Sequence, residues 1–109
     1  MEEKDIIKAL SALAQPSRLR VFRALVQAGP LGLTPGQLCE TLEVPPATMS
    51  FHLKELTNAQ LALPVREGRN LFYTAQFAHM NNVVAYLTEN CCQGQPCGPT
   101  NQPSKTVCS

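Results

Sequence analysis

Residues 46–61 read PATMSFHLKELTNAQL, and this stretch decides the fold. Met49, Leu53, Leu56 and Gln60 recur at i, i+4, i+7 and i+11, which places them on one narrow stripe of a helix. Proline is well tolerated in the first turn of a helix, so Pro46 suits its start. The stretch therefore predicts one amphipathic helix. Its opposite face has few acids and carries Ala47, Thr48, Ser50, Phe51, Lys54 and Asn58.

A second helix is expected just before this one, over residues 33–42. Thr34-Pro35-Gly36-Gln37 has the pattern of a capping box with proline at the first helical position. Glu43-Val44-Pro45 then makes a tight turn. Two helices in this relation are typical of a helix-turn-helix, in which the second helix reads DNA. An ordinary surface helix in a small bundle fits the stretch equally well when it is taken alone.

A β-hairpin is predicted directly after the reading helix. Residues 61–66 and 70–75 are short apolar and aromatic runs that flank Glu67-Gly68-Arg69. Arg66 and Arg69 stand near the tip, where arginines can lie against phosphate or enter the minor groove. Two solvent-exposed arginines on a turn are the plainer interpretation. The position behind a helix-turn-helix favours a DNA-binding wing.

The first and last helices are expected over residues 1–14 and 77–90, and both carry broad apolar stripes. A further helix over residues 17–28 has three arginines around its exposed side and ends at Gly29. Packing on the domain's own core is one use for the two stripes. A symmetric dimer is the other, and it would set two reading helices about one DNA turn apart. The stripes are Ile6, Ile7, Leu10 and Leu13 in the first helix and Phe77, Met80, Val83, Val84 and Leu87 in the last.

Composition bounds the possibilities. The chain has 109 residues, enough for one domain, and its 44% hydrophobic content with no tryptophan predicts an aliphatic core. The net charge of +1 does not by itself indicate a nucleic-acid binder, so DNA binding must rest on local charge and on pairing two copies. No long apolar run or signal peptide is seen, and we expect a cytoplasmic protein with no membrane partner.

Four of the five cysteines lie in the last 19 residues. Cys91, Cys92 and Cys97 fall within seven residues, and the intervening glycine and proline let the three sulfurs converge. Zinc prefers four ligands, whereas three thiolates suit a soft three-coordinate ion such as trivalent arsenic or antimony. Cys108 is an alternative third ligand, and spectator thiols are the plainer interpretation. Cys39, alone on its helix, is expected to be a small buried hydrophobe.

This order of elements resembles the ArsR/SmtB family of winged-helix metalloregulatory repressors. The residues that carry the resemblance are 10–20 (LSALAQPSRLR), 49–56 (MSFHLKEL) and 66–73 (REGRNLFY), and it extends over residues 5 to about 90. It implies a mainly α fold with a β-hairpin wing and a homodimer joined by the first and last helices. Asn90-Cys91-Cys92 looks like arsenite-responsive members that carry sensor cysteines at the end of the last helix. We therefore expect a winged helix-turn-helix domain over residues 1–90 and an inducer-binding tail over 91–109.

The resemblance also has departures. Many arsenic-responsive members carry Cys-x-Cys in the third helix, where this chain has Thr34 and Gly36. The last helix has His79 and Glu89 but not the Asp-x-His and His-x-x-Glu pattern of zinc-responsive members. Both absences place sensing on the tail cysteines. Family members put DNA contacts at the positions of Thr48, Ser50 and His52, although the helical wheel turns His52 toward the buried side. The full expected DNA-contacting set is Thr48, Ser50, Phe51, His52, Lys54, Arg66 and Arg69.

The expected function is a repressor that binds double-stranded operator DNA as a homodimer and dissociates on binding arsenite or antimonite. A thiol-oxidation sensor of the same fold is one alternative, and a thiol-rich metal-buffering protein without DNA binding is another. His52 and His79 are isolated, and neither a nucleophile–base pair nor a carboxylate pair appears at useful spacing. An enzyme, and with it a catalytic cofactor, is not expected.

Overall fold

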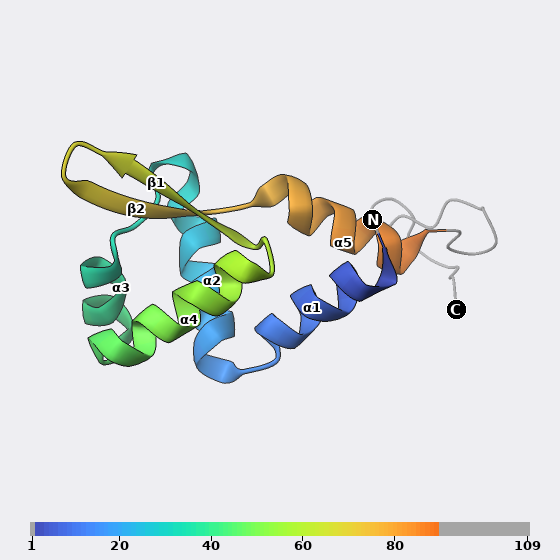
Figure 1. Cartoon of the computed structure of the whole chain (residues 1–109), viewed down its shortest axis with the longest axis horizontal. Coiled ribbons are helices and arrows are strands. Elements are labelled where there is room, and N and C mark those ends of the chain that lie inside the picture. Colours follow the sequence, from blue (N-terminus) through green and yellow to red (C-terminus); the bar gives the residue numbers. More distant parts are fainter. Residues whose placement is uncertain (1, 90–109) are drawn as a thin grey trace, which may run out of the picture.

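Five α-helices and one β-hairpin make up residues 2–89, the part of the chain that the computed structural model describes (Figure 1). The mainly α fold with a hairpin wing is thereby confirmed. The predicted tail over residues 91–109 lies outside the described residues. In chain order the elements are α1 (Glu3–Leu13), α2 (Pro16–Ala28), the 3₁₀ turn η1 (Gly29–Leu31), α3 (Pro35–Leu42), α4 (Pro46–Asn58), β1 (Ala62–Glu67), β2 (Asn70–Ala75) and α5 (Phe77–Thr88).

The core is aliphatic and draws on all five helices. Burying one large aliphatic side chain stabilises a fold by about 1.5–3 kcal/mol relative to leaving that side chain in water. The large side chains that are fully buried are Val21, Leu25, Leu38, Met49, Leu56, Leu61 and Val83.

The inward stripe of the reading helix is confirmed at Met49, Leu53 and Leu56 but wrong at Gln60. α4 ends at Asn58, and Gln60 is exposed with a left-handed φ of 64°. The Gln60 amide donates to the Thr57 carbonyl, and the Leu61 amide donates to the Leu56 carbonyl at 2.9 Å. This is a Schellman closure, which satisfies the last carbonyls and folds Leu61 back onto Leu56.

α3 and α4 form the predicted helix-turn-helix. The hydroxyl of Thr34 accepts a hydrogen bond from the backbone N–H of Gln37 at 3.1 Å. The side-chain oxygen of Gln37 accepts one from the backbone N–H of Thr34 at 2.8 Å, so the capping box is confirmed. Glu43 ends α3 with a φ of 55°. Pro45 is then the N-cap of α4 and Pro46 its first residue.

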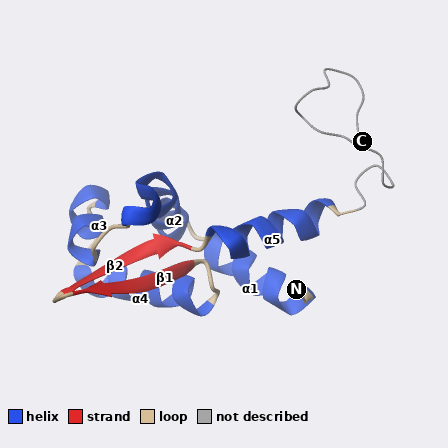
Figure 2. Ribbon diagram, turned by 90° about the horizontal axis from the view of Figure 1, so that it is seen from above, coloured by secondary structure: helices blue, strands red, loops and turns tan. Residues whose placement is uncertain are grey.

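The wing is an antiparallel hairpin with a two-residue loop. Glu67 pairs with Asn70, and Gly68 has a φ of 62°, as the first central residue of a type II′ turn requires. Leu33 forms an isolated antiparallel bridge with Tyr73 of β2. The Leu33 N–H donates to the Tyr73 carbonyl at 3.0 Å, and the Leu33 carbonyl accepts a hydrogen bond from the Tyr73 N–H at 2.8 Å. Figure 2 shows the resulting placement of the hairpin beside α3.

The base of the wing is closed by one further hydrogen bond. The Gln76 amide, at the N-cap of α5, donates to the Leu61 carbonyl at 2.9 Å. The chain therefore enters and leaves the hairpin at one place, directly after α4 and directly before α5.

α1 and α5 pack together at the end of the domain opposite the wing tip (Figures 1 and 2). Each leaves large apolar side chains in contact with water. No helix within residues 2–89 is long and apolar enough to cross a membrane. The exposed side chains are Ile7 and Leu10 on α1, and Phe77, Val84 and Leu87 on α5.

Candidate nucleic-acid interface

The outward face of α4 carries hydrogen-bonding, basic and aromatic groups. Thr48, Ser50 and Lys54 are exposed, and Phe51 is 52% exposed. Hydroxyls and an ammonium group can bond phosphates and base edges, and an aromatic ring can make apolar contacts in the major groove. The inward residues that turn this face outward are Met49, Leu53 and Leu56, which the core buries.

His52 is not part of this face, and its expected DNA contact needs correction. Its side chain is only 3% exposed, because the position lies on the side of α4 that packs on α2. Nδ1 accepts a hydrogen bond from Arg18 Nε at 3.4 Å, whereas Nε2 has no hydrogen-bond partner among residues 2–89. Burial lowers the pKa of His52 below its usual range, and the positive charge of Arg18 lowers it further. The imidazole is therefore a neutral, interior group.

Arg18 is a structural residue that the sequence pattern placed among exposed arginines. Its guanidinium is half-buried and also donates from Nη1 to the Ala12 carbonyl at 3.3 Å. Cζ lies 5.6 Å from the centroid of the Phe51 ring, within cation–π range. The partners are on α1 and α4, so helical spacing within α2 carried no signal of these contacts.

The wing contributes two further basic groups. Arg66 and Arg69 are exposed near the tip of the hairpin. Among residues 2–89 the ion pair present joins Lys4 to Glu2, so Lys54, Arg66 and Arg69 are not paired with a carboxylate there. Their charges are free to meet phosphate oxygens.

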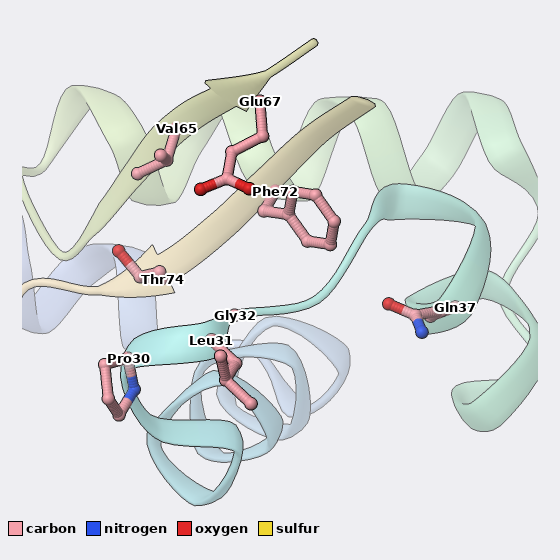
Figure 3. Close-up of a pocket in the computed structure, with 8 residues that line it drawn as sticks. All are labelled: Pro30, Leu31, Gly32, Gln37, Val65, Glu67, Phe72 and Thr74. Atoms are coloured by element: carbon pink, nitrogen blue, oxygen red, sulfur yellow. The ribbon is translucent and has the colours of Figure 1, made fainter. Parts of the chain in front are cut away.

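A groove of about 380 Å³ lies between the hairpin and η1 (Figure 3). Its walls are mostly apolar, and the Glu67 carboxylate projects from β1 beside Phe72. None of the expected DNA-contacting residues lines it. The lining residues are Pro30, Leu31, Gly32, Gln37, Val65, Glu67, Phe72 and Thr74.

The described residues hold a single free cysteine. Cys39 packs against the core but is only half-buried, so the expected burial is partial. Residues 2–89 contain no group of three or more His, Cys, Asp or Glu side chains that could hold a metal ion. The predicted inducer ligands Cys91, Cys92, Cys97 and Cys108 lie outside the described residues.

The fold and this exposed surface define a winged helix-turn-helix protein. A family profile described as a helix-turn-helix domain matches residues 13–64. Among curated proteins, the chain is 31% identical over 80 residues to the transcriptional regulator NmtR of Mycobacterium tuberculosis, and 28% identical over 89 residues to an SmtB repressor homologue of Synechocystis. The matches cover 73% and 82% of this chain. They span 64% and 65% of those relatives, and only 36% of the regulator YdfF of Bacillus subtilis.

Solved structures agree on the fold. An ArsR-like transcriptional regulator from Rhodococcus superposes with a TM-score of 0.70 at 24% identity, over 77% of this chain and 76% of that one. A homodimeric winged helix-turn-helix DNA-binding domain from Mycobacterium bovis gives 0.64 at 20% identity, over 80% and 81%. Together the solved structures confirm the winged helix-turn-helix fold, and the curated relatives that this chain resembles are named as transcriptional regulators or repressors. These relatives are regulators rather than enzymes.

Proposed function

We propose that this protein is a repressor that binds operator DNA as a homodimer and releases it on binding trivalent arsenic or antimony. The observation that carries DNA binding is the exposed face of α4 together with the basic wing. Thr48, Ser50 and Lys54 stand on one helix face, and Arg66 and Arg69 extend the surface. In a winged helix-turn-helix, such a helix enters the major groove while the wing lies on the backbone or in the minor groove.

Dimerisation supplies the affinity for DNA that one copy of the chain lacks. A net charge of +1 gives little general attraction to DNA, so two reading helices in successive major grooves are needed for useful affinity. The exposed apolar side chains of α1 and α5 belong to two helices that pack together at one end of the domain, which suits an isologous contact. Ile7 and Leu87, 55% and 58% exposed, are the clearest candidates for burial there.

The inducer part of the proposal rests on thiol chemistry. Cys91, Cys92 and Cys97, with Cys108 as an alternative third ligand, provide soft sulfur donors that suit trivalent arsenic or antimony. The tail that holds them follows α5, the expected dimer helix. Binding there releases DNA only if the ion prefers the DNA-free conformation, because only differential affinity shifts an equilibrium.

DNA binding is tested first. A duplex pool with about 30 random base pairs, enough for two half-sites one helical turn apart, is selected against the purified protein. A recovered duplex with two related half-sites, bound by a dimer in analytical ultracentrifugation, is the expected result. Recovery of no duplex refutes DNA binding and favours a metal-buffering protein.

Induction is tested on the recovered duplex. Arsenite is expected to release wild-type protein, and Cys91→Ser, Cys92→Ser and Cys97→Ser are expected to bind DNA but resist release. Cys39→Ser is the matched control and should respond like the wild type. Release by peroxide with loss of free thiols, but not by arsenite, supports the oxidation sensor instead. Release of all three tail variants by arsenite places the site elsewhere.

A further inference from the structure

We propose that Phe51, held in place by the guanidinium of Arg18, is the specificity-determining residue of α4 and reads the C5-methyl group of thymine. The inference rests on the proposed DNA-binding function. It assigns a readout to the ring and a positioning role to an arginine that itself does not contact DNA.

The position of Phe51 points to base readout. It is the large apolar side chain on the outward face of α4, and its neighbours there are Thr48, Ser50 and Lys54. Hydroxyl and ammonium groups form hydrogen bonds, and every base pair and phosphate offers partners for them. An aromatic ring has no such partner to seek. In the major groove the apolar group that a base presents is the methyl of thymine.

Arg18 fixes the ring through three contacts. Its Nε donates to His52 Nδ1 at 3.4 Å and its Nη1 donates to the Ala12 carbonyl at 3.3 Å. Both acceptors are anchored, because His52 is buried in the core and Ala12 lies in the last turn of α1. The guanidinium held between them lies over the Phe51 ring, with Cζ 5.6 Å from the centroid. The ring keeps this neighbour on one side and is still 52% exposed.

We call the contacts of Arg18 with His52, Ala12 and Phe51 the Arg18 clamp, and its chemistry is specific to arginine. The planar guanidinium has donors at Nε and Nη1 in a fixed fork, so one group reaches two acceptors and still lies over a ring. A lysine ammonium keeps the charge but is a single point at the end of a flexible stem. Arg18→Lys therefore preserves any attraction to phosphate while removing the clamp.

The probe is a duplex recovered from the random pool, compared with the same duplex in which each half-site thymine is replaced by uracil. This change deletes only methyl groups. Wild-type protein should bind the uracil duplex about fourfold more weakly for each thymine that is read, the equivalent of one methyl-sized apolar contact. Phe51→Ala should bind both duplexes within about twofold of each other. Since the side chain is half exposed, this variant should fold like the wild type.

Arg18→Lys should lose most of the thymine preference and keep the dependence of affinity on salt. Arg23→Lys, an exposed arginine on the same helix, is the matched control and should behave like the wild type. In Phe51→Ala, adding Arg18→Lys should change the preference no further. Without DNA, Arg18→Gln should raise the pKa of His52 measured by NMR titration, because the variant removes the positive charge that lowers it.

Several results overturn the proposal. Wild-type protein that binds both duplexes equally refutes the thymine readout while leaving the proposed function intact. An Arg18→Lys variant with full preference refutes the clamp. If Arg18→Gln reduces the slope of log affinity against log salt by about 0.9, Arg18 is a phosphate contact instead. Wild-type protein that binds no duplex refutes both this inference and the proposed function.

Discussion

Gly32→Ala is expected to detach the wing from α3, and Gly29→Ala is its matched control. Both glycines have φ near +70°, with ψ of −153° at Gly29 and −174° at Gly32. This backbone region is essentially confined to glycine, so either substitution costs roughly 1–3 kcal/mol. The two sites differ in what a new Cβ meets. In the described part of the chain, no other atom lies within 4 Å of a Cβ built at Gly29, whereas at Gly32 the Tyr73 carbonyl oxygen would lie at 2.5 Å and Thr74 Cγ2 at 2.8 Å.

The Gly32 contact cannot be relieved by a side-chain rotation, because one of the atoms is backbone. Relief requires β2 to move away from Leu33, which breaks the two Leu33–Tyr73 hydrogen bonds. At about 0.5–1.5 kcal/mol each, their loss adds roughly 1–3 kcal/mol. Gly32→Ala should therefore lower the free energy of unfolding by roughly 1–3 kcal/mol more than Gly29→Ala.

Urea titrations at one protein concentration measure this difference, since the stability of a dimer depends on concentration. Hydrogen exchange should also show faster exchange of the Tyr73 amide in Gly32→Ala alone. Equal unfolding free energies for the two variants, with the Tyr73 amide still protected, would refute the reasoning that close approach at Gly32 holds the wing.

Three further predictions concern α4, its cap and the wing. Because the pKa of His52 is lowered in the folded state, the unfolded chain binds more protons below about pH 6.5, so His52 lowers the free energy of unfolding as pH drops below that value and adds no pH dependence above it. Urea midpoints against pH should show this fall, and His52→Gln should flatten that part of the profile. Gln60→Gly should raise the unfolding free energy by up to about 1 kcal/mol, since the left-handed φ of 64° favours glycine; an unchanged midpoint contradicts the Schellman argument. Arg66→Ala and Arg69→Ala should each reduce the salt slope of DNA binding by about 0.9 if each meets one phosphate, whereas Arg20→Ala should leave it unchanged.

The elements of the fold were predictable because local signals agree with tertiary packing. The Thr34 capping box, Pro46 at the start of α4 and the glycine in the hairpin turn each mark a boundary by their own chemistry. Gln60 shows where this fails. The spacing of Gln60 continues the apolar stripe, but the helix ends two residues earlier, at Asn58. The chain then folds back so that Leu61 is fully buried in the core.

The candidate site was predictable only where it lies on one helix or one turn. Thr48, Ser50 and Lys54 are exposed as helical spacing requires. The burial of His52 and the role of Arg18 depend on a contact between residues 34 positions apart, and periodicity within a helix does not report such contacts. The Leu33–Tyr73 bridge was missed for the same reason.

The hydrogen bond from Gln76 to Leu61 has a mechanical consequence. It joins the last residue before α5 to the residue at which α4 has just closed, with the whole hairpin looped out between them. Only Gln76 separates β2 from α5, so we expect a tilt of α5 to move the end of α4 and the base of the wing with it. Under the proposed function, one change at α5 would therefore alter the position of α4 and of the wing together.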